Sequence, residues 1–458
     1  MQALCKRLKK AFANAFLFVW LEKICLERAW VWEAGAIMPD DAYDVVVVGA
    51  GPGGSTCAAF LGKKGRKVLL VDKEKFPRDK TCGDAISGKS MSILRELGLD
   101  SEVERSDHGV VGGVLFSSPE GRMVRIPLRK GDGKLERSYT CRRQVYDNLL
   151  FRNAAKSATV LEGASAIELV KEEGRVVGVK LRTPDGERVV RAKIVVGADG
   201  TGSAIAKGVE GHEVDPAHTC IAYRGYYSGI ADAKDSLEIH FVKSIMPGYF
   251  WIFPLENGIA NVGVGMVMED MKKKGASPQK AMEEMLASNP LFRQRFANAK
   301  LVSQIKAWSL PFGSKKRAGS AAGLLLVGDA FGLVDPFSGE GIGNAMLSGK
   351  IAAEVADEAL SEGDFSGERL KKYDERVWAA VGGELDTSYK MQKLGKNEWL
   401  LNFVVAKAEK SERAREAIAS TFTSQEAKQG YSSPLFYFKL LFPCRFCLPP
   451  IFLRKTGA

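Results

Sequence analysis

The most informative hydrophobic pattern in the chain covers residues 43–72. Tyr43 to Val48 is a mainly apolar, β-branched run that Asp44 alone interrupts, as expected for a strand buried on both faces of a parallel sheet. A glycine-rich turn follows, then a helical stretch over residues 55–63, and then a second apolar run over 67–71 that ends in Asp72. The order of these segments predicts a strand, a turn, a helix and a second parallel strand.

The glycines of this turn fill the pattern GxGxxG, and each has its own physical role. Gly49 permits a tight turn, Gly51 lets the backbone approach a pyrophosphate, and Gly54 lets the helix pack closely on the strand. The helix N-terminus presents free N–H groups and the positive end of its dipole to phosphate. Asp72 lies about 20 residues beyond the glycines, where a carboxylate accepts the hydroxyls of an unphosphorylated ribose. We therefore expect a dinucleotide site.

Two further apolar strands also end in an acid and a glycine. Residues 187–196 run into a turn that contains Asp199, and residues 324–327 run into a turn that contains Asp329. An Asp-Gly turn is common by itself. Its recurrence after buried strands of one chain favours a functional role for these turns over an incidental one.

A glycine-rich loop between Pro336 and Gly343 follows Asp329, and the pattern predicts a long helix from near Ile342. Backbone N–H groups of such a loop at a helix N-terminus stabilise a ring oxygen that gains negative charge on reduction. A flavin ring has such an oxygen and a nicotinamide ring does not. The loop therefore favours a flavin dinucleotide as the cofactor.

The middle of the chain has a different pattern. Residues 110–116 and 122–128 alternate like a hairpin, and residues 216–310 contain alternating strands rich in aromatic residues. Helical patterns cover 271–289 and 290–299, and a charged helical region follows later.

The predicted fold class is α/β, a Rossmann-like cofactor-binding domain with an inserted β-rich substrate domain and a C-terminal helical region. The expected boundaries are 1–41 for an N-terminal extension, 42–110 with 140–215 and 318–362 for the cofactor domain, 111–139 with 216–317 for the β-rich domain, and 363–458 for the helical region.

The composition restricts the class of partner. The 458 residues carry 66 Lys and Arg against 55 Asp and Glu, a formal net charge of +11, which suits a membrane surface, an anionic substrate or nucleic acid. The basic residues are dispersed without a nucleic-acid-binding motif, so we expect no nucleic acid partner. Eight scattered cysteines suit a reducing cytoplasm. The four histidines lack ligand spacing and no G-x-S-x-G elbow occurs, so we expect neither a metal site nor an α/β-hydrolase.

Both ends of the chain carry apolar stretches that are too short or too interrupted to span a bilayer. Residues 11–21 follow a basic start, and Glu22 and Lys23 end the run. This segment fits either an amphipathic helix on a membrane surface or sequence that precedes a native start at Met38. The tail over 434–453 contains basic residues and several prolines, and it fits either a hydrophobic membrane contact or packing against the N-terminal segment. We expect a cytoplasmic protein that is peripheral at the cytoplasmic face of the membrane.

Three segments together resemble the FAD fingerprints of the hydroxylase-like flavoproteins: GAGPGG with its following acid, GADGTGS, and LLVGDAFGLVDPFSGEG. That class includes aromatic hydroxylases, flavin halogenases and geranylgeranyl reductases, and the resemblance covers most of residues 42–360. It implies that the first site holds the ADP half of FAD and that Asp329 binds the ribityl chain. The FAD-binding residues that it implies are Gly49, Gly51, Gly54, Asp72, Lys73, Cys82, Gly83, Asp84, Ala85, Arg143, Asp199, Asp329, Gly341, Ile342 and Gly343.

Two further segments are similar to the geranylgeranyl reductases in particular. PRDKTCGDAIS resembles their loop after the second strand, and the run from Tyr249 to Pro254 fits their YxWxFP pattern. The chain lacks the W-x-W-x-I-P motif of halogenases. The resemblance implies that Tyr249, Trp251 and Phe253 line a tunnel for a prenyl chain beside the flavin.

The resemblance implies that the enzyme reduces carbon–carbon double bonds of a polyprenyl lipid. An isolated trisubstituted alkene is not electrophilic, so a proton must arrive before or together with the hydride from flavin N5. Aromatic faces stabilise the cationic character that develops on the alkene. We expect Cys82, Tyr249 and Trp251 to be catalytic, with Cys82 or Tyr249 as the proton donor.

Several points stay open from the sequence. The chain has no second GxGxxG, so the electron donor is either NAD(P)H, bound transiently, or a ferredoxin-like protein. A flavin monooxygenase acting on an apolar substrate is the main alternative activity, and a non-catalytic flavin-bearing membrane protein is a more distant one. The sequence does not identify the prenyl lipid or the number of double bonds reduced.

Overall fold

The structure is a computed structural model that describes residues 43–128, 137–412, 414, 415 and 418. Contacts divide the chain into two units, Met1–Ala42 and Tyr43–Ala458, and the described residues all belong to the second. The expectations for the N-terminal extension and for the apolar tail over 434–453 lie outside the described residues.

The two strands predicted around the first glycine turn lie in the middle of a mainly parallel sheet. β1 (Tyr43–Val48) pairs in parallel with β2 (Val68–Asp72) on one side and with β10 (Gly186–Gly197) on the other. The order along the sheet is β17-β18-β10-β1-β2-β7. Its other members are β7 (Thr159–Glu162), β17 (Ser320–Ala321) and β18 (Leu324–Leu326), and β10 extends into an antiparallel pairing with β9 (Arg175–Thr183) and, beyond it, β8 (Ser165–Glu172).

β10 changes its environment along its length, and its sequence reflects this change. Its first part alternates between exposed and buried positions while it pairs antiparallel with β9. From Ile194 to Gly197 every residue is buried, and this part pairs in parallel with β1 and β18. A parallel strand covered on both faces requires a continuous apolar run, and the chain provides one here.

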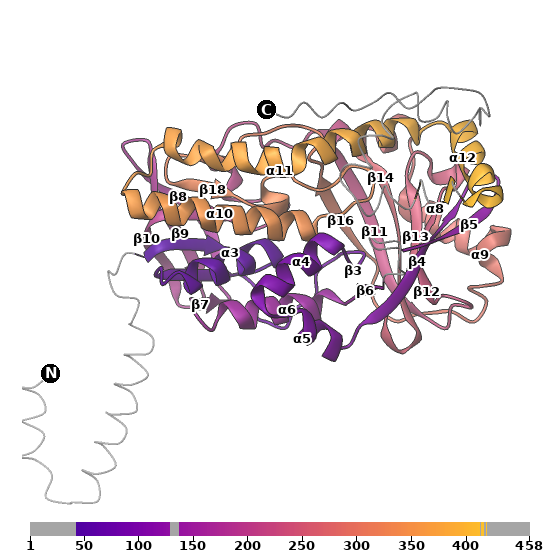
Figure 1. Ribbon diagram of the computed structural model, residues 1–458, viewed down its shortest axis with the longest axis horizontal. Coiled ribbons are helices and arrows are strands. Elements are labelled where there is room, and N and C mark those ends of the chain that lie inside the picture. The colour runs from indigo at the N-terminus through magenta and orange to yellow at the C-terminus, as the bar shows by residue number, and fades with distance from the viewer. Residues whose placement is uncertain (1–42, 129–136, 413, 416–417, 419–458) are drawn as a thin grey trace, which may run out of the picture. The chain divides into compact units, whose positions relative to one another are not determined.

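Helices pack side by side against the parallel sheet (Figure 1). α3 (Pro52–Lys63) lies between α6 (Arg143–Ala154) and α10 (Ile342–Glu362), and α11 (Gly367–Leu394) packs on the far side of α10. α4 (Gly88–Leu97) packs against α10 and precedes α5 (Asp100–Arg105). The helix predicted from near Ile342 is confirmed, and it begins at that residue.

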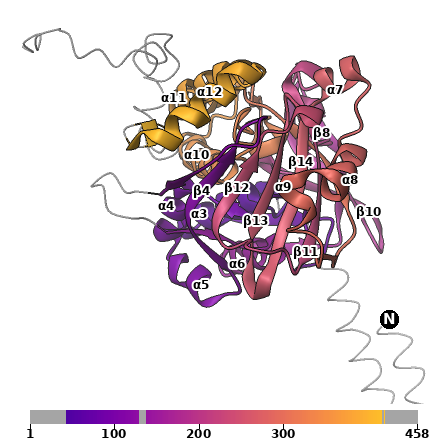
Figure 2. The ribbon, with the colours of Figure 1, turned by 90° about the vertical axis from the view of Figure 1, so that its right-hand side faces the viewer.

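The second sheet draws its strands from two separate parts of the chain (Figure 2). Its order is β15-β11-β14-β13-β12-β4-β6-β3, with β16 beside β11 and β5 beside β4. The hairpin predicted over 110–128 is confirmed, since β4 and β5 pair antiparallel. The strands are β3 (Ala85–Ile86), β4 (Gly109–Ser117), β5 (Met123–Pro127), β6 (Ser138–Thr140), β11 (Thr219–Ser228), β12 (Asp235–His240), β13 (Tyr249–Pro254), β14 (Ile259–Val267), β15 (Lys300–Leu301) and β16 (Lys306–Pro311).

The helices after β14 are shorter than the sequence pattern predicted. The structure has α7 (Met268–Lys274), α8 (Pro278–Ser288) and α9 (Pro290–Arg293) where continuous helices over 271–289 and 290–299 were expected. Gly275 ends α7 in a left-handed conformation with φ 58°, and prolines begin the next two helices. Beyond α11 the described chain continues with α12 (Glu398–Lys410).

A close backbone crossing holds α3 against α10. A Cβ atom placed on Gly349 of α10 would lie 2.2 Å from the carbonyl oxygen of Gly53 in α3. No side chain fits in that space unless the two helices separate. The position of α3 matters for function because its N-terminus follows the glycine turn.

We expect Gly349→Ala to destabilise the protein, by about 1–3 kcal/mol, because the added methyl group forces the two helices apart. Gly382→Ala in α11 is the matched control. Its Cβ would lie 3.7 Å from Trp378, an ordinary contact, and alanine is the better helix former by up to about 1 kcal/mol. Denaturant unfolding of both variants tests this, and equal stability of the two would contradict the crossing described here.

Candidate active site

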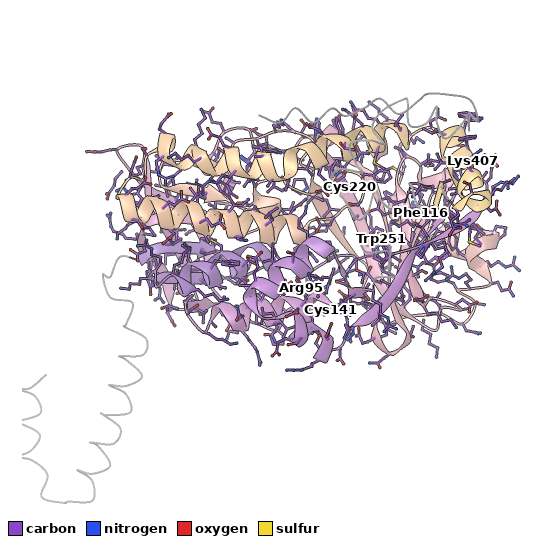
Figure 3. The ribbon with its side chains drawn as sticks, viewed as in Figure 1. Arg95, Phe116, Cys141, Cys220, Trp251 and Lys407 are labelled. Carbon is purple, nitrogen blue, oxygen red and sulfur yellow. The ribbon has the colours of Figure 1, made fainter. Side chains whose placement is uncertain are left out.

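A cavity of about 1600 Å³ lies between the two sheets. One side is the edge of the parallel sheet where the glycine turn and the two Asp-Gly turns meet, and the other is a face of the second sheet. Figure 3 labels two residues of that second wall, Trp251 on β13 and Cys220 on β11. Sites for one small ligand have volumes of roughly 300–1,000 Å³, so this cavity has room for a large cofactor and a second molecule.

The three glycines of the first turn have different surroundings, as their roles require. Gly49 adopts φ 100°, and Gly54 approaches it so closely that a Cβ would lie 1.8 Å from the Gly49 carbonyl oxygen. Gly51 instead faces open space, with only an Arg78 nitrogen 3.7 Å from its virtual Cβ. It also begins α3 without any side-chain cap. Free backbone N–H groups thus face the cavity where a pyrophosphate would bind.

Asp72 stabilises this turn through its buried carboxylate. One oxygen accepts a hydrogen bond from the Ala50 N–H at 2.7 Å, and the other accepts from the Glu74 N–H at 2.9 Å. Each oxygen keeps a second lone pair for a ribose hydroxyl. Asp72 and Lys73 both line the cavity. The acid at the end of β2 therefore has a structural role besides the ribose contact expected from the sequence.

Two arginines share one buried carboxylate beside the glycine turn. Arg143 at the start of α6 makes two hydrogen bonds to Asp147, at 2.6 and 2.8 Å, and Arg78 makes one at 2.7 Å. Burial raises the pKa of Asp147, but the two guanidinium groups outweigh burial and hold this pKa below its ordinary value. One positive charge remains in excess at the cavity wall. Phosphate of a dinucleotide matches that excess charge.

Arg78 is a site residue that the sequence did not identify. Its guanidinium stacks over the ring of Phe76 at 4.8 Å, and Phe76 stacks on Phe151 of α6 with ring centroids 4.2 Å apart. These contacts direct Arg78 toward Gly51. The arginine follows the sequence Phe-Pro in the loop after β2, and that position alone carried no signal for phosphate binding.

The Asp-Gly turns occupy neighbouring positions in the wall. Asp199 accepts hydrogen bonds from the Ser203 hydroxyl and the Ala204 N–H, so much of its carboxylate is used to shape its own turn. Asp329 follows β18 and lies 4.0 Å from the Lys80 ammonium group. Burial lowers the pKa of Lys80. Both acids line the cavity.

The N-terminus of α10 contributes part of the wall expected to face a flavin ring. Gly341 and Ile342 line the cavity, and Gly341 caps the helix without a side-chain hydrogen bond. Gly343 does not line the cavity. Its N–H donates a hydrogen bond to the Glu340 carboxylate at 2.5 Å. Gly54 also lies outside the lining and acts only through helix packing. Two glycine turns at helix N-termini, of which that of α3 has no side-chain cap, and an arginine pair fit an FAD molecule.

The loop after β2 contributes Cys82, Gly83, Asp84 and Ala85 to the lining. Asn261 of β14 connects this loop to the second sheet. Its amide nitrogen donates to the Cys82 carbonyl at 2.6 Å and to Asp84 at 2.7 Å, and its oxygen accepts from the Trp251 indole N–H at 2.9 Å.

Tyr249, Trp251 and Phe253 lie on one face of β13 and line the cavity together, as the alternation of a strand requires. Their rings follow one another with centroids 6.0 and 6.3 Å apart. The Trp251 indole lies across β14, where a Cβ on Gly263 would come within 2.2 Å of it. The Tyr249 hydroxyl donates to the Ser338 carbonyl at 2.9 Å, which connects this wall to the loop before α10. The sequence did not predict the glycine position beneath Trp251.

Beyond the aromatic residues the cavity wall is apolar. Side chains from β4, β11, β12 and β16 line this part, among them Val114, Leu237, Ile239 and Leu310, together with Phe241 directly after β12. Within the described residues no group of three His, Cys, Asp or Glu side chains is arranged to hold a metal ion. No described helix is both long enough and apolar enough to cross a membrane.

The cavity and fold define a class of protein, and comparison with known proteins agrees. Residues 42–381 match the family model described as FAD binding domain. The protein is an FAD-dependent oxidoreductase. The digeranylgeranylglycerophospholipid reductase of Methanosarcina acetivorans is 34% identical over 356 residues, covering 76% of this chain and 83% of the relative. The enzyme of the same name from Methanocaldococcus jannaschii is 36% identical over 344 residues, covering 74% and 82%.

A solved structure gives the same assignment. The geranylgeranyl bacteriochlorophyll reductase-like protein of Thermoplasma acidophilum superimposes with a TM-score of 0.74 and 26% identity, covering 85% of this chain and 98% of that one. The chain belongs to the geranylgeranyl reductase family of FAD-dependent oxidoreductases. The fold class predicted from the sequence and the FAD cofactor are both confirmed.

We expect Arg78→Ala to weaken FAD binding about 10- to 100-fold, because a charged hydrogen-bond donor to phosphate contributes about 1.5–3 kcal/mol. Titration of the apoprotein with FAD, followed by flavin fluorescence, measures the change. Arg66→Ala is the control, since Arg66 binds Asp357 on α10 and does not line the cavity. Equal FAD affinity of the two variants would show that Arg78 does not contact the cofactor.

Proposed function

We propose that the protein saturates carbon–carbon double bonds in the polyprenyl chain of a lipid. The observation that carries this proposal is the shared cavity: the two glycine turns form one wall, and Tyr249, Trp251, Phe253 and the apolar residues beyond them form the other. An elongated hydrocarbon matches such a wall, whereas a small phenol would leave most of it uncovered. The names of the relatives support a geranylgeranyl lipid as the substrate class.

Reduced FAD supplies a hydride to such a substrate, and the protein must supply orientation, a dry environment and a proton. Protonation of the less substituted alkene carbon develops positive charge on the tertiary carbon. The faces of Tyr249 and Trp251 stabilise that charge, because aromatic rings attract cations. This stabilisation acts on the transition state and not on the neutral alkene, so it accelerates the reaction.

The two proton donors expected from the sequence have different surroundings. The Tyr249 hydroxyl is occupied by its hydrogen bond to Ser338, and burial raises the pKa of Tyr249 further above its ordinary value. A tyrosine in this state is a poor acid at neutral pH. Cys82 borders the cavity next to Arg143. Of the two, Cys82 is the better-placed group, and Tyr249 serves as an aromatic surface.

The reductant in this proposal is NAD(P)H or a ferredoxin-like protein, because the sequence contains only one GxGxxG turn.

The lipid substrate resides in a bilayer, so the enzyme must meet the membrane at its surface. We place this contact at the cytoplasmic face. The scattered cysteines and the net charge of +11 support that location.

Anaerobic incubation of the FAD-loaded protein with a geranylgeranyl glycerophospholipid and dithionite tests the proposal. We expect the lipid mass to rise by two hydrogens per reduced double bond, as measured by mass spectrometry. Protein without FAD is the control. If the mass stays constant without oxygen and gains oxygen once air and NAD(P)H are supplied, the enzyme is a monooxygenase and the proposal is wrong.

Tyr249→Phe separates the two roles of this residue. The variant keeps the aromatic face and loses the hydroxyl, so we expect the rate of lipid reduction to fall less than about tenfold. Tyr249→Leu removes the face as well, and we expect a loss of about tenfold or more beyond that of the phenylalanine variant, from the cation–π term. Single-turnover rates measure both. A loss for Tyr249→Phe as large as that for Tyr249→Leu would assign the proton to the hydroxyl.

A further inference from the structure

A buried acid cluster lies in the cavity wall and is connected to the aromatic residues through Asn261. Asp84 has no exposed surface, and its Oδ2 atom accepts hydrogen bonds from the Tyr226 hydroxyl at 2.9 Å and from the Asn261 amide at 2.7 Å. The same amide group binds the Trp251 indole. Asp84 is also one of the residues that line the cavity. The cluster therefore connects a carboxyl group to the surface where the alkene would lie.

The backbone at Asp84 is strained, which is unusual for a residue with only a packing role. Its φ is 65°, in the left-handed region that favours glycine, and Gly83 precedes it. A Cβ on Gly83 would lie 3.2 Å from the Phe253 ring, a tight contact that would require the ring to shift. The Asp84 carbonyl accepts a hydrogen bond from the Cys141 N–H at 2.8 Å, which holds the conformation.

The hydrogen-bond pattern determines where a proton would reside on Asp84. Both donors approach Oδ2, and Oδ1 has no partner among the described residues. A neutral carboxyl group carries its proton on one oxygen. Because Oδ2 already accepts two hydrogen bonds, the proton belongs on Oδ1.

The surrounding charges leave this carboxyl group able to titrate. Burial raises the pKa of Asp84 to about 6, and the opposing influences are Asn261, Arg224, Tyr226 and Arg143. Arg224 forms an ion pair with Asp79 at 2.9 Å. Its positive charge therefore stabilises the Asp84 carboxylate less than that of an unpaired arginine would. Cys141 also faces the cluster, and burial raises the pKa of that thiol to about 12, so it stays neutral. A general acid is most effective with a pKa close to the working pH.

We propose that Asp84 is the proton donor for alkene reduction, and this inference rests on the proposed function. The O–H bond at Oδ1 breaks as a C–H bond forms at the less substituted alkene carbon. The tertiary carbon takes the hydride that reduced FAD supplies, so the alkene gains two hydrogens and two electrons. Asp84 is left as a carboxylate, stabilised by Tyr226 and Asn261, until solvent returns a proton.

The variant Asp84→Asn removes the proton while it preserves size and an acceptor oxygen. We expect the single-turnover rate of lipid reduction, measured with FAD-saturated protein, to fall about 100-fold or more, the usual contribution of a general acid. Asp374→Asn is the control. Asp374 is a largely buried acid of α11 whose pKa is also raised by burial, and it does not line the cavity. An unchanged rate for Asp84→Asn overturns the proposal.

A second measurement needs neither substrate nor FAD. Asp84 is expected to keep its proton in the folded protein up to a pH of about 6, whereas its ordinary pKa is 3.8. Stability of the wild type therefore falls, through this group, as the pH rises through that window. Relative to wild type, the melting temperature of Asp84→Asn should rise over the same interval and level off above it. A pH-independent difference would show that Asp84 does not titrate there, and would contradict the proposal.

Tyr226→Phe provides a conservative third test. Loss of the hydroxyl donor raises the pKa of Asp84, because that hydrogen bond favours the carboxylate. We expect the high-pH decline of the single-turnover rate to move to higher pH in this variant. A decline that does not move contradicts the assignment. If the wild type itself leaves the lipid unreduced, the proposed function fails, and the melting measurement still decides the titration of Asp84.

Discussion

The hydrogen bonds of the buried Asn261 side chain determine how the two walls of the cavity are joined. Its amide group contacts the Cys82 carbonyl, the Asp84 carboxyl group and the Trp251 indole, and the side chain has no exposed surface. Replacing it by an apolar residue would remove three hydrogen bonds and leave the buried Trp251 indole N–H without its acceptor, at a cost of about 1–3 kcal/mol, while Asp84 would keep only the bond from Tyr226. Asn261 thus joins the loop after β2 to the aromatic strand β13, and Tyr226 and Arg224 of β11 add further hydrogen bonds to the same loop.

Buried charges in the cavity wall serve two opposite purposes, and the balance of cations and anions decides which. Beside the glycine turn, Arg78 and Arg143 share the single carboxylate of Asp147, so positive charge is in excess and the acid stays ionised. At Asp84 the charge of Arg224 is shared with Asp79, so burial dominates and raises the pKa of Asp84 above its ordinary value. The first arrangement suits an anion that remains bound, and the second suits a proton that is repeatedly exchanged.

The sequence predicted those features that depend on the local order of residues. The apolar run, the glycines and the acid of the first unit are consecutive, so the strand, turn and helix and the start of α10 at Ile342 were all predicted correctly. The continuous helix expected over 271–289 was wrong, because a left-handed Gly275 and Pro278 divide it.

Features that depend on long-range contacts could not be read from the sequence. Arg78 becomes a phosphate-site candidate only because Phe76 stacks on Phe151, far away in sequence, and Asn261 only because β14 lies beside β13. The glycine at 263 gives a similar example. In the sequence it interrupts an alternating strand, and in the structure it provides the flat surface on which the Trp251 indole lies.

An apolar cavity that excludes water must keep its proton source within the wall. When a prenyl chain fills the space beside Trp251, it removes the remaining water and raises the pKa of any carboxyl group nearby. Substrate binding therefore favours the protonated form of Asp84, the form that the reaction consumes. Transfer of the proton then leaves a buried anion held by only two hydrogen bonds, which is costly until a proton returns. Two events are therefore coupled: the prenyl chain moves from one double bond to the next, and Asp84 regains its proton. Both require water to enter the same part of the cavity.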